Sequence, residues 1–405
     1  MRQPWGHPRS LRRCGSVAGT PESDACTAQR LHGTMTRMTS HWLSKRAGSF
    51  ESSGIRRVFD LAAKLNDPIN LSIGQPDFDV PNEAKKALID AVNSQKGGYT
   101  PTQGLAVLQN TLQKRIDEQF HHSGRSLFIA SGTSGALALA LLITVDPGDE
   151  VIFFDPYFVM YDALVKMVGG IPVIVDTYPN FQYDIGRLEE AITPKTKMIL
   201  FNSPSNPTGM VATREEVKAV AELAAKHDIL LISDEIYSAF CFQEFISPAE
   251  YNPKTLVLDG FSKTYGMPGW RVGYAHGPKE LIEQMLKFQQ YTFVCSPHVG
   301  QLGALAALDV DMSGQIETYR KRRDTLYDAL KDDYEINKPE GAFYMFPKTP
   351  WGSGAEFVEK AITDYSMLII PGNVFSRRDT HFRISYASTE STIHRGIEAF
   401  KKLVR

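Results

Sequence analysis

A lysine and an arginine stand eight residues apart in a glycine-rich segment that follows the apolar run LVL. The segment is DGFSKTYGMPGWRVGY, and the two residues are Lys263 and Arg271. A lysine amine is a nucleophile only when it is unprotonated, and burial or a neighbouring positive charge lowers its pKa. The pattern therefore predicts a reactive amine at the end of a buried strand, able to condense with an aldehyde.

Further polar and aromatic side chains follow the other apolar runs. SLFIAS is followed by Gly132-Thr133-Ser134, EVIFFD by Phe158 and KMILFN by Asn206, whereas ILLISD ends in Asp234 and is followed by Tyr237. In an open α/β sheet, ligands bind at the carboxyl ends of the strands. We therefore expect these side chains to meet Lys263 at one edge of one sheet.

Each of these residues also has an explanation that involves no ligand. A serine or threonine at a helix start caps the helix, and Asn206 before a proline makes a turn. Phe158 fits a core, and Asp234 fits a cap or an ion pair. Lys263 fits an exposed surface, and Arg271 fits a structural ion pair.

Together, however, the same side chains match one ligand. Hydroxyls, a helix start and an arginine bind a phosphate. A buried carboxylate holds a protonated ring nitrogen, an amide and a phenol bond a ring oxygen, and an aromatic side chain stacks on the ring. With a lysine that condenses with an aldehyde, the set predicts pyridoxal phosphate.

The segment GFSKTYGMPGWRVG resembles the signature around the cofactor lysine of class I aminotransferases, the aspartate aminotransferase-like family of fold type I. The motifs LSIGQPDFDVP, YTPTQG, SGTSGAL, DPYFVMY, NSPSNPTG, SDEIY and HFRISYA also stand in the order of that family. The resemblance covers roughly residues 45–405 and implies a transaminase that depends on pyridoxal phosphate.

The resemblance also implies catalytic roles. Lys263 is the lysine that carries the cofactor and moves protons, and Asp234 pairs with the ring nitrogen. Tyr237 and Asn206 bond the ring oxygen, and Phe158 stacks on the ring.

Other residues are implied in binding the phosphate and the substrate. The residues implied around the phosphate are Gly132, Thr133, Ser134, Ser262 and Arg271. Arg383 grips the substrate α-carboxylate, with help from Asn206 and the Gly74 backbone. Tyr99 reaches the phosphate of the neighbouring subunit, so the resemblance implies a homodimer with shared active sites.

The alternation of apolar runs with helix-like segments predicts an α/β fold. Runs that are apolar on both faces, separated by helices, are typical of a mostly parallel sheet covered by helices on both faces. We expect this large cofactor-binding domain over residues 75–311, and a smaller α+β domain over 45–74 and 312–405, as in pyridoxal-phosphate-dependent transferases of fold type I. The spacing predicts a further helix over 54–66.

Composition excludes several classes of partner. The formal net charge of −2 argues against a nucleic-acid or membrane-surface binder, because such proteins carry a basic excess. The cysteines are scattered, at positions 14, 26, 241 and 295, with no histidines at metal-ligand spacing. The scattered cysteines argue against a disulfide framework and against a metal site, and they fit the reducing environment of the cytoplasm.

The first 44 residues differ from the rest, since they are rich in arginine and lack a periodic apolar pattern. We expect a disordered extension. A transit peptide or a start codon placed too far upstream, with Met35 and Met38 as later starts, are the alternatives.

An aminotransferase with 2-oxoglutarate as acceptor and aspartate, aromatic or broad donor specificity is the function we predict. Another enzyme of the same fold type, such as a carbon–sulfur lyase or a cyclopropane-forming synthase, is the alternative. A transcription regulator is disfavoured, because the residues before the fold are too few and too patternless for a helix-turn-helix. Ser134 stands where some dicarboxylate-specific relatives carry a lysine, which disfavours strict aspartate specificity.

Overall fold

The computed structural model describes residues 40–48, 50, 54, 58, 65–94, 96–120 and 124–404. The chain divides into two compact units, residues 1–51 and 52–405. In the first unit the structure describes a 3₁₀ turn, η1 (Ser40–Trp42), and a short helix, α2 (Lys45–Gly48). The expected extension over 1–44 and the predicted helix over 54–66 lie mostly outside the described residues.

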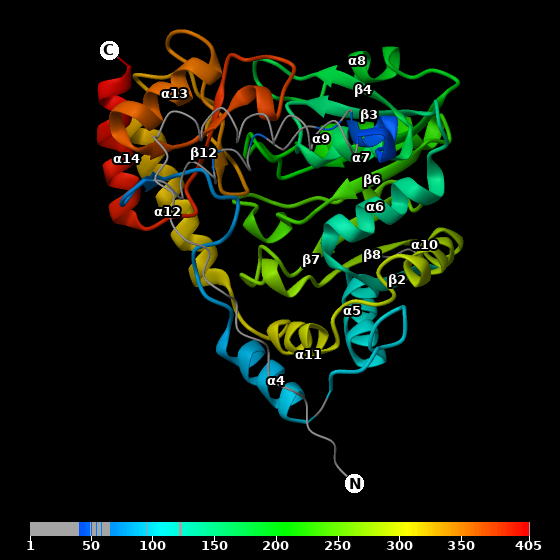
Figure 1. The fold of residues 1–405 in the computed structure, drawn as a ribbon. Coiled ribbons are helices and arrows are strands. Elements are labelled where there is room, and N and C mark those ends of the chain that lie inside the picture. Colours follow the sequence, from blue (N-terminus) through cyan, green and yellow to red (C-terminus); the bar gives the residue numbers. More distant parts are fainter. Residues whose placement is uncertain are drawn as a thin grey trace, which may run out of the picture. The chain divides into compact units, whose positions relative to one another are not determined.

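The second unit contains a seven-stranded sheet in the order β2-β8-β7-β6-β5-β3-β4 (Figure 1). Its strands are β2 (Arg125–Ala130), β3 (Glu150–Asp155), β4 (Ile171–Asp176), β5 (Thr196–Asn202), β6 (Leu230–Asp234), β7 (Leu256–Gly260) and β8 (Gly273–Pro278). Neighbouring strands from β4 to β7 run parallel, whereas β8 is antiparallel to both β2 and β7. The mostly parallel sheet is therefore confirmed.

Helices cover both faces of this sheet. In β3, Val151 and Phe153 pack with α6 (Gly132–Thr144), α7 (Met160–Val168) and α10 (Lys279–Tyr291). Ile152 and Phe154, on the opposite face, pack with α8 (Ile185–Glu190) and α9 (Arg214–Lys226). The apolar runs of the sequence are continuous because both faces of each strand are buried.

Further helices extend the cover over the β2–β8–β7 side. They are α4 (Asn82–Asn93), α5 (Ala106–Gln119) and α11 (His298–Ala307), which share a core with Leu127, Ile129 and Val257. The apolar run ALALALLITV (136–145) makes up most of α6.

The antiparallel direction of β8 brings its first residue to the edge where β7 ends. Gly260, the last residue of β7, pairs with Gly273, the first of β8. A Cβ on Gly273 would lie 2.5 Å from the backbone nitrogen of Thr133, so glycine there lets the start of α6 approach the sheet. Residues just before β8 therefore reach the same edge as residues that follow the parallel strands.

Two smaller sheets also lie in the described part of the second unit. One is three-stranded, with β11 (Ile370–Pro371), β12 (Phe382–Ser385) and β9 (Tyr344–Met345), and the other pairs β1 (Ile69–Asn70) with β10 (Met367–Leu368). They share a core with α12 (Ser313–Leu330), α13 (Gly354–Tyr365) and α14 (Glu390–Leu403), seen together in Figure 1. Short 3₁₀ turns connect the elements: η2 (Ser238–Phe240), η3 (Pro248–Glu250), η4 (Pro268–Trp270) and η5 (Gly372–Val374).

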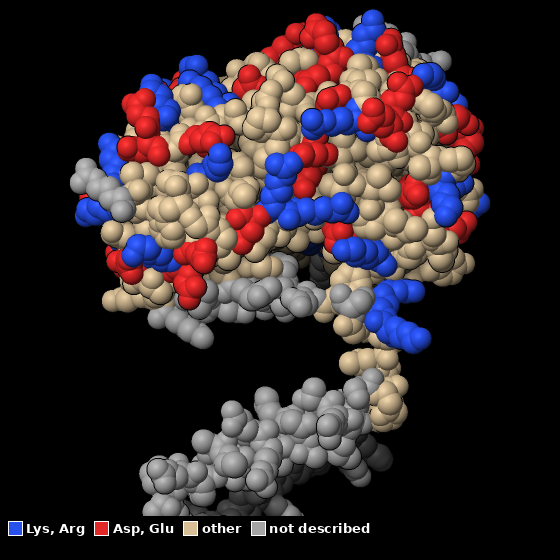
Figure 2. Space-filling view, turned by 90° about the horizontal axis from the view of Figure 1, so that it is seen from above, with Lys and Arg blue, Asp and Glu red and all other residues tan. Residues whose placement is uncertain are grey.

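On the face shown in Figure 2, acidic and basic side chains are interspersed over the surface. No helix in the described part of the chain is long and apolar enough to span a bilayer. The predicted α/β architecture is confirmed, whereas the boundaries proposed for the two domains stay a prediction.

Candidate active site

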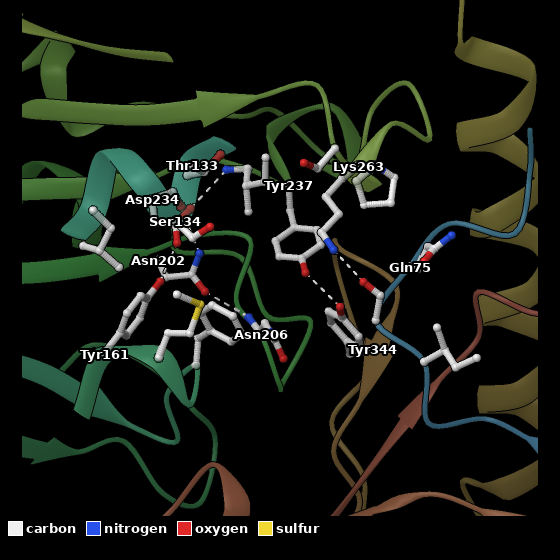
Figure 3. Close-up of a pocket in the computed structure, with 18 of the residues that line it drawn as sticks. Gln75, Thr133, Ser134, Tyr161, Asn202, Asn206, Asp234, Tyr237, Lys263 and Tyr344 are labelled. Carbon is white, nitrogen blue, oxygen red and sulfur yellow. Dashed lines mark hydrogen bonds between the residues drawn. The ribbon is translucent and has the colours of Figure 1, made fainter. Parts of the chain in front are cut away.

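A cavity of about 370 Å³ lies where the strand ends of the large sheet face the three-stranded sheet (Figure 3). This volume is in the range of small-molecule sites. The predicted site residues that line it are Gly74, Thr133, Ser134, Phe158, Asn206, Asp234, Tyr237, Ser262, Lys263, Arg271 and Arg383. The sequence motifs, which are far apart along the chain, thus meet at one place.

Lys263 follows the end of β7 and points into the cavity. Its amine donates a hydrogen bond of 2.5 Å to the carbonyl oxygen of Gly74. Burial and, to a smaller extent, the nearby charge of Arg383 together lower the pKa of this amine to about 8, while Asp234 opposes the shift. A larger fraction of the amine is therefore neutral near neutral pH than for an exposed lysine.

Asp234 is the last residue of β6 and is 8% exposed. Its Oδ2 accepts a hydrogen bond of 2.7 Å from the hydroxyl of Tyr161 in α7, which is drawn in Figure 3. Burial raises the pKa of this carboxyl, and the Tyr161 hydrogen bond and the charge of Lys263 oppose the rise. A cationic partner in the cavity would favour the ionised carboxylate further.

The start of α6 offers free backbone N–H groups to the cavity. The Ser131 side chain makes no capping bond to them, whereas α9 is closed by a capping box of Thr213 and Glu216. Uncapped amides and the helix dipole together favour an anion.

Arg271 places a guanidinium beside this helix start. Its Nη2 donates to the Ser134 hydroxyl at 2.8 Å, and a Cβ on Gly132 would overlap the guanidinium. Arg271 itself has a φ of 55°, in the left-handed region that non-glycine residues seldom adopt. This conformation turns the chain from η4 into β8 at the sheet edge.

Two asparagines connect the ends of β5 and β6. The side-chain nitrogen of Asn202 donates to the backbone oxygen of Asp234 at 2.9 Å, and its Oδ1 accepts from the Asn206 backbone at 3.0 Å. Asn206 Oδ1 in turn accepts 3.0 Å from Arg383 Nη1. The Asn206 side chain is thus fixed while its amide nitrogen remains a donor for a ligand.

Arg383 comes from β12 and is 2% exposed. Its Nη2 donates to the Ser72 carbonyl oxygen at 2.8 Å, and its Nε is a buried donor without a partner among the residues that the structure describes. Its Cζ lies 4.5 Å from the ring centre of Tyr344 and 4.5 Å from that of Phe375. The guanidinium is therefore held between rings with hydrogen-bonding capacity to spare, as an anion site requires.

Two predicted residues do not line the cavity. Gly132 lies directly beside it, against Arg271, where only a residue without a side chain fits. Tyr99 is 86% exposed and lies on the surface, where the neighbouring Gly98 carbonyl contacts His298.

Some lining residues were not predicted as site residues. They include Tyr161, Asn202, Tyr344 and Gln75. Tyr161 was visible only as the last letter of DPYFVMY, three residues after Phe158, and it lies in the first turn of α7 whereas Phe158 precedes that helix. Tyr344 lies inside a buried apolar segment, GAFYMFP, where sequence alone does not distinguish a core tyrosine from a site tyrosine.

The residues of the cavity fit pyridoxal phosphate. The open helix start and Arg271 match its phosphate, the buried Asp234 matches its ring nitrogen, and the low-pKa amine of Lys263 matches its aldehyde. The fit rests on the donor groups and on the space beside Gly132.

The model of the family "Aminotransferase class I and II" matches residues 66–400. A probable aspartate aminotransferase of Methanocaldococcus jannaschii is 36% identical over 89% of this chain and 99% of its own length. An aromatic-amino-acid aminotransferase of Thermococcus litoralis is 31% identical over 90% of this chain and 98% of its own.

Solved structures agree with this relationship. The aspartate aminotransferase of Thermus thermophilus with maleate superposes with a TM-score of 0.85 at 33% identity, over 89% of this chain and 99% of that chain. Members of the family depend on pyridoxal phosphate and act on amino acids and oxo acids. The chain therefore belongs to the class I and II aminotransferases of fold type I, and it is a transaminase.

Proposed function

We propose that this transaminase uses pyridoxal phosphate to move an amino group from an L-amino acid to a 2-oxo acid such as 2-oxoglutarate. The observation that carries the proposal is the pairing in one cavity of an amine with a lowered pKa, Lys263, and a buried carboxylate, Asp234. A reactive amine and an acid that holds a ring proton are the two groups that this cofactor needs from its protein.

The proposed holding groups come from several elements. The backbone amides at the start of α6, the hydroxyls of Thr133, Ser134 and Ser262, and the Arg271 guanidinium would hold the phosphate, with Gly132 leaving room for it. Tyr237 and the Asn206 amide would bond the ring oxygen, and Phe158 would lie on the ring.

The bound cofactor supplies an aldehyde carbon that takes up the amino group and a ring that accepts electrons from the substrate. Lys263 acts as general base on the α-proton of the amino acid, and then as general acid. Asp234 keeps the ring nitrogen protonated, because a buried carboxylate favours a cationic partner. Arg383 fixes the substrate by its α-carboxylate, with Asn206 and the Gly74 backbone beside it.

The donor is proposed to be aromatic, aspartate or broad in range. Among the described residues, the cations that line the cavity are Lys263, Arg271 and Arg383, and each already has a partner in this scheme. The side-chain carboxylate of aspartate would then find no further cation among the described residues that line the cavity. Ile73, Leu137, Met160 and Ile236 also line the cavity, and they suit an apolar side chain.

A homodimer with shared sites is also proposed. The exposed Tyr99 belongs to a segment that packs against the last turns of α10 and the residues that follow them, since Gln289 Nε2 in α10 donates to the Thr102 carbonyl oxygen at 2.6 Å. That region exposes Phe288, Tyr291, Phe293 and Val294. An exposed apolar surface of this kind favours a protein partner, and a second copy would bring Tyr99 to a neighbouring site.

Subunit exchange tests the shared site. Lys263→Ala and Tyr99→Ala are each expected to lower activity, and mixed dimers are expected to recover part of it. If Tyr99 acts across the interface, a mixed dimer has one site with both defects and one intact site. Proven exchange without recovery would contradict the shared site.

The reaction itself is tested by a rate survey. Aspartate, alanine, phenylalanine and tyrosine are each offered with 2-oxoglutarate, and formation of glutamate is measured with and without added pyridoxal phosphate. Amino-group transfer that depends on the oxo acid supports the proposal. Substrate breakdown that does not depend on an oxo acid would overturn it in favour of another reaction.

We further propose that the chain is divided into a cofactor-binding domain, 75–311, and a smaller domain, 45–74 and 312–405. This division is supported by Arg383 and Tyr344, which come from the small three-stranded sheet.

We also propose a cytoplasmic location. Cys241 and Cys295 are free thiols, which suits a reducing compartment.

A further inference from the structure

Tyr344 contacts both Arg383, which is proposed to bind the substrate, and Tyr237, which is proposed to bind the cofactor. Tyr344 itself has no role in the assignments above. It lies in β9, is 1% exposed, and lines the cavity. The antiparallel pairing of β9 with β12 places Ser385 opposite Tyr344 and Ile384 opposite Met345. Arg383 and Tyr344 are therefore fixed relative to each other by the backbone of one small sheet.

The Tyr344 ring holds the guanidinium of Arg383. The Arg383 Cζ lies 4.5 Å from this ring centre, and Phe375 covers it at the same distance from another direction. An aromatic ring attracts a cation through its quadrupole, and a planar guanidinium packs well against a ring face. Without the ring, Arg383 would keep its charge but lose one of the contacts that hold its plane.

The Tyr344 hydroxyl meets Tyr237, whose hydroxyl lies 2.8 Å away (Figure 3). A Cβ on Gly74 would lie 2.7 Å from the same hydroxyl, so this oxygen sits in a tightly enclosed place. A phenol hydroxyl both donates and accepts. If Tyr344 donates to the Tyr237 oxygen, the Tyr237 proton is left to point at a ligand.

We propose that Tyr344 is a positioning residue that joins the two ends of the site. Its ring orients Arg383 toward the substrate carboxylate, and its hydroxyl directs the proton of Tyr237 toward the ring oxygen of the cofactor. This inference rests on the proposed function. It assigns separate tasks to two parts of one side chain, and the two tasks can be removed one at a time.

The test uses Tyr344→Phe, which keeps the ring, and Tyr344→Met, which removes the ring and fills space with a flexible apolar chain. The readouts are the dissociation constant of pyridoxal phosphate from quenching of protein fluorescence, the pH titration of the visible absorbance of the bound cofactor, and KM for an amino acid and for 2-oxoglutarate. Tyr386→Phe is the matched control. It removes another fully buried hydroxyl, which contacts the Ala342 carbonyl oxygen at 3.2 Å and does not line the cavity.

Tyr344→Phe is expected to weaken cofactor binding by about three- to tenfold, the usual effect of one buried hydrogen bond, and to shift the absorbance titration. Its KM values should stay within about twofold of wild type, because the ring remains. Tyr344→Met should show the same cofactor defect and raise both KM values by about tenfold. Tyr386→Phe should move none of these quantities.

A double-mutant cycle separates positioning from general packing. In a Tyr237→Phe background, Tyr344→Phe should add no further cofactor defect, because its hydroxyl acts through Tyr237. Additive defects would overturn this role, and so would unchanged KM values in Tyr344→Met. If Tyr344→Met does not fold, the cycle with Tyr344→Phe still decides the hydroxyl role. A wild type that neither binds pyridoxal phosphate nor transaminates would overturn the proposed function as well, whereas additivity in a functional wild type overturns only the inference.

Discussion

The seven-stranded sheet and the three-stranded sheet supply site residues in different ways. The large sheet presents them at strand ends and in the turns that follow, such as Asp234 at the end of β6 and Lys263 after β7. The small sheet presents Tyr344, the first residue of β9, and Arg383, the second residue of β12, and both side chains are almost fully buried. The groups proposed to react thus lie at strand ends and in turns of the large sheet, whereas the groups proposed to recognise the substrate are held by packing in the small sheet.

This difference has an electrostatic counterpart. The groups of the large sheet have pKa values shifted by burial, which lowers the pKa of the Lys263 amine to about 8 and raises that of the Asp234 carboxyl. The Arg383 guanidinium of the small sheet is instead enclosed by rings and neutral acceptors that hold its orientation. Variants of the large sheet should therefore change turnover, and variants of the small sheet should change substrate affinity.

Lys263→Ala should have the largest effect. Removal of the amine eliminates both the attachment point and the proton carrier, so turnover should fall by at least about 10⁴-fold. The cofactor should still bind, because the groups around its phosphate remain. Borohydride reduction of the wild type, followed by peptide mapping, should place the cofactor on Lys263.

Lys279→Ala is the matched control, since this exposed lysine starts α10 and pairs only loosely with Glu283 at 3.9 Å. Its activity should stay within about twofold of wild type, as for most surface substitutions. A label recovered on any lysine other than Lys263 would contradict the assignment.

Asp234→Ala should lower kcat by about 10²- to 10³-fold, the usual loss when a preorganised charge is removed from a reacting centre. Cofactor affinity should fall much less, because the carboxylate mainly stabilises charge that develops during the reaction. Steady-state rates at saturating cofactor measure the first quantity and a fluorescence titration measures the second. A near-normal kcat would refute the role of Asp234.

Arg383→Lys should raise KM for the amino acid and the oxo acid alike, by about ten- to a hundredfold, because an ammonium cannot make the parallel hydrogen bonds of a guanidinium. Arg271→Lys provides the contrast within the same cavity, since it should weaken cofactor binding and leave KM at saturating cofactor nearly unchanged. If Arg383→Lys lowered kcat and left both KM values unchanged, the proposal that the small sheet sets substrate affinity would be contradicted.

The sequence predicted the large sheet, and most of the residues it singled out at the strand ends line the cavity, because the pattern of these residues is local. Apolar strand, polar end and glycine turn are contiguous, as in the segment around Lys263 and Arg271. The α/β architecture followed from the same alternation. The antiparallel direction of β8 could not be predicted in this way, because an apolar run does not indicate whether its strand will be parallel or antiparallel to its neighbours.

The missed residues depend on contacts between distant segments. Tyr344 is brought to Tyr237 across 107 positions, and Tyr161 to Asp234 across 73. A tyrosine in an apolar segment is most often part of the core, so neither residue was distinguishable by type or spacing. Arg383 was assigned only through the family resemblance for the same reason.

Tyr161→Phe should have the smallest effect and should sharpen the comparison most. The Tyr161 hydroxyl donates to Asp234 and stabilises the ionised carboxylate, so it lowers the pKa of Asp234 against the rise caused by burial. Without the hydroxyl the pKa of Asp234 rises, and the carboxylate takes up a proton at a higher pH. The acidic limb of the kcat/KM profile should therefore move to higher pH, while kcat at the optimum falls only about two- to tenfold, as expected for one hydrogen bond.

Tyr157→Phe is the control. Tyr157 is half-buried nearby, its ring centre lies 4.9 Å from that of Phe153, and it does not line the cavity. It should leave the acidic limb in place. An acidic limb that does not move in Tyr161→Phe, or moves to lower pH, would show that this limb is not set by Asp234, and the separation between a large sheet that tunes charge and a small sheet that holds substrate would lose its support.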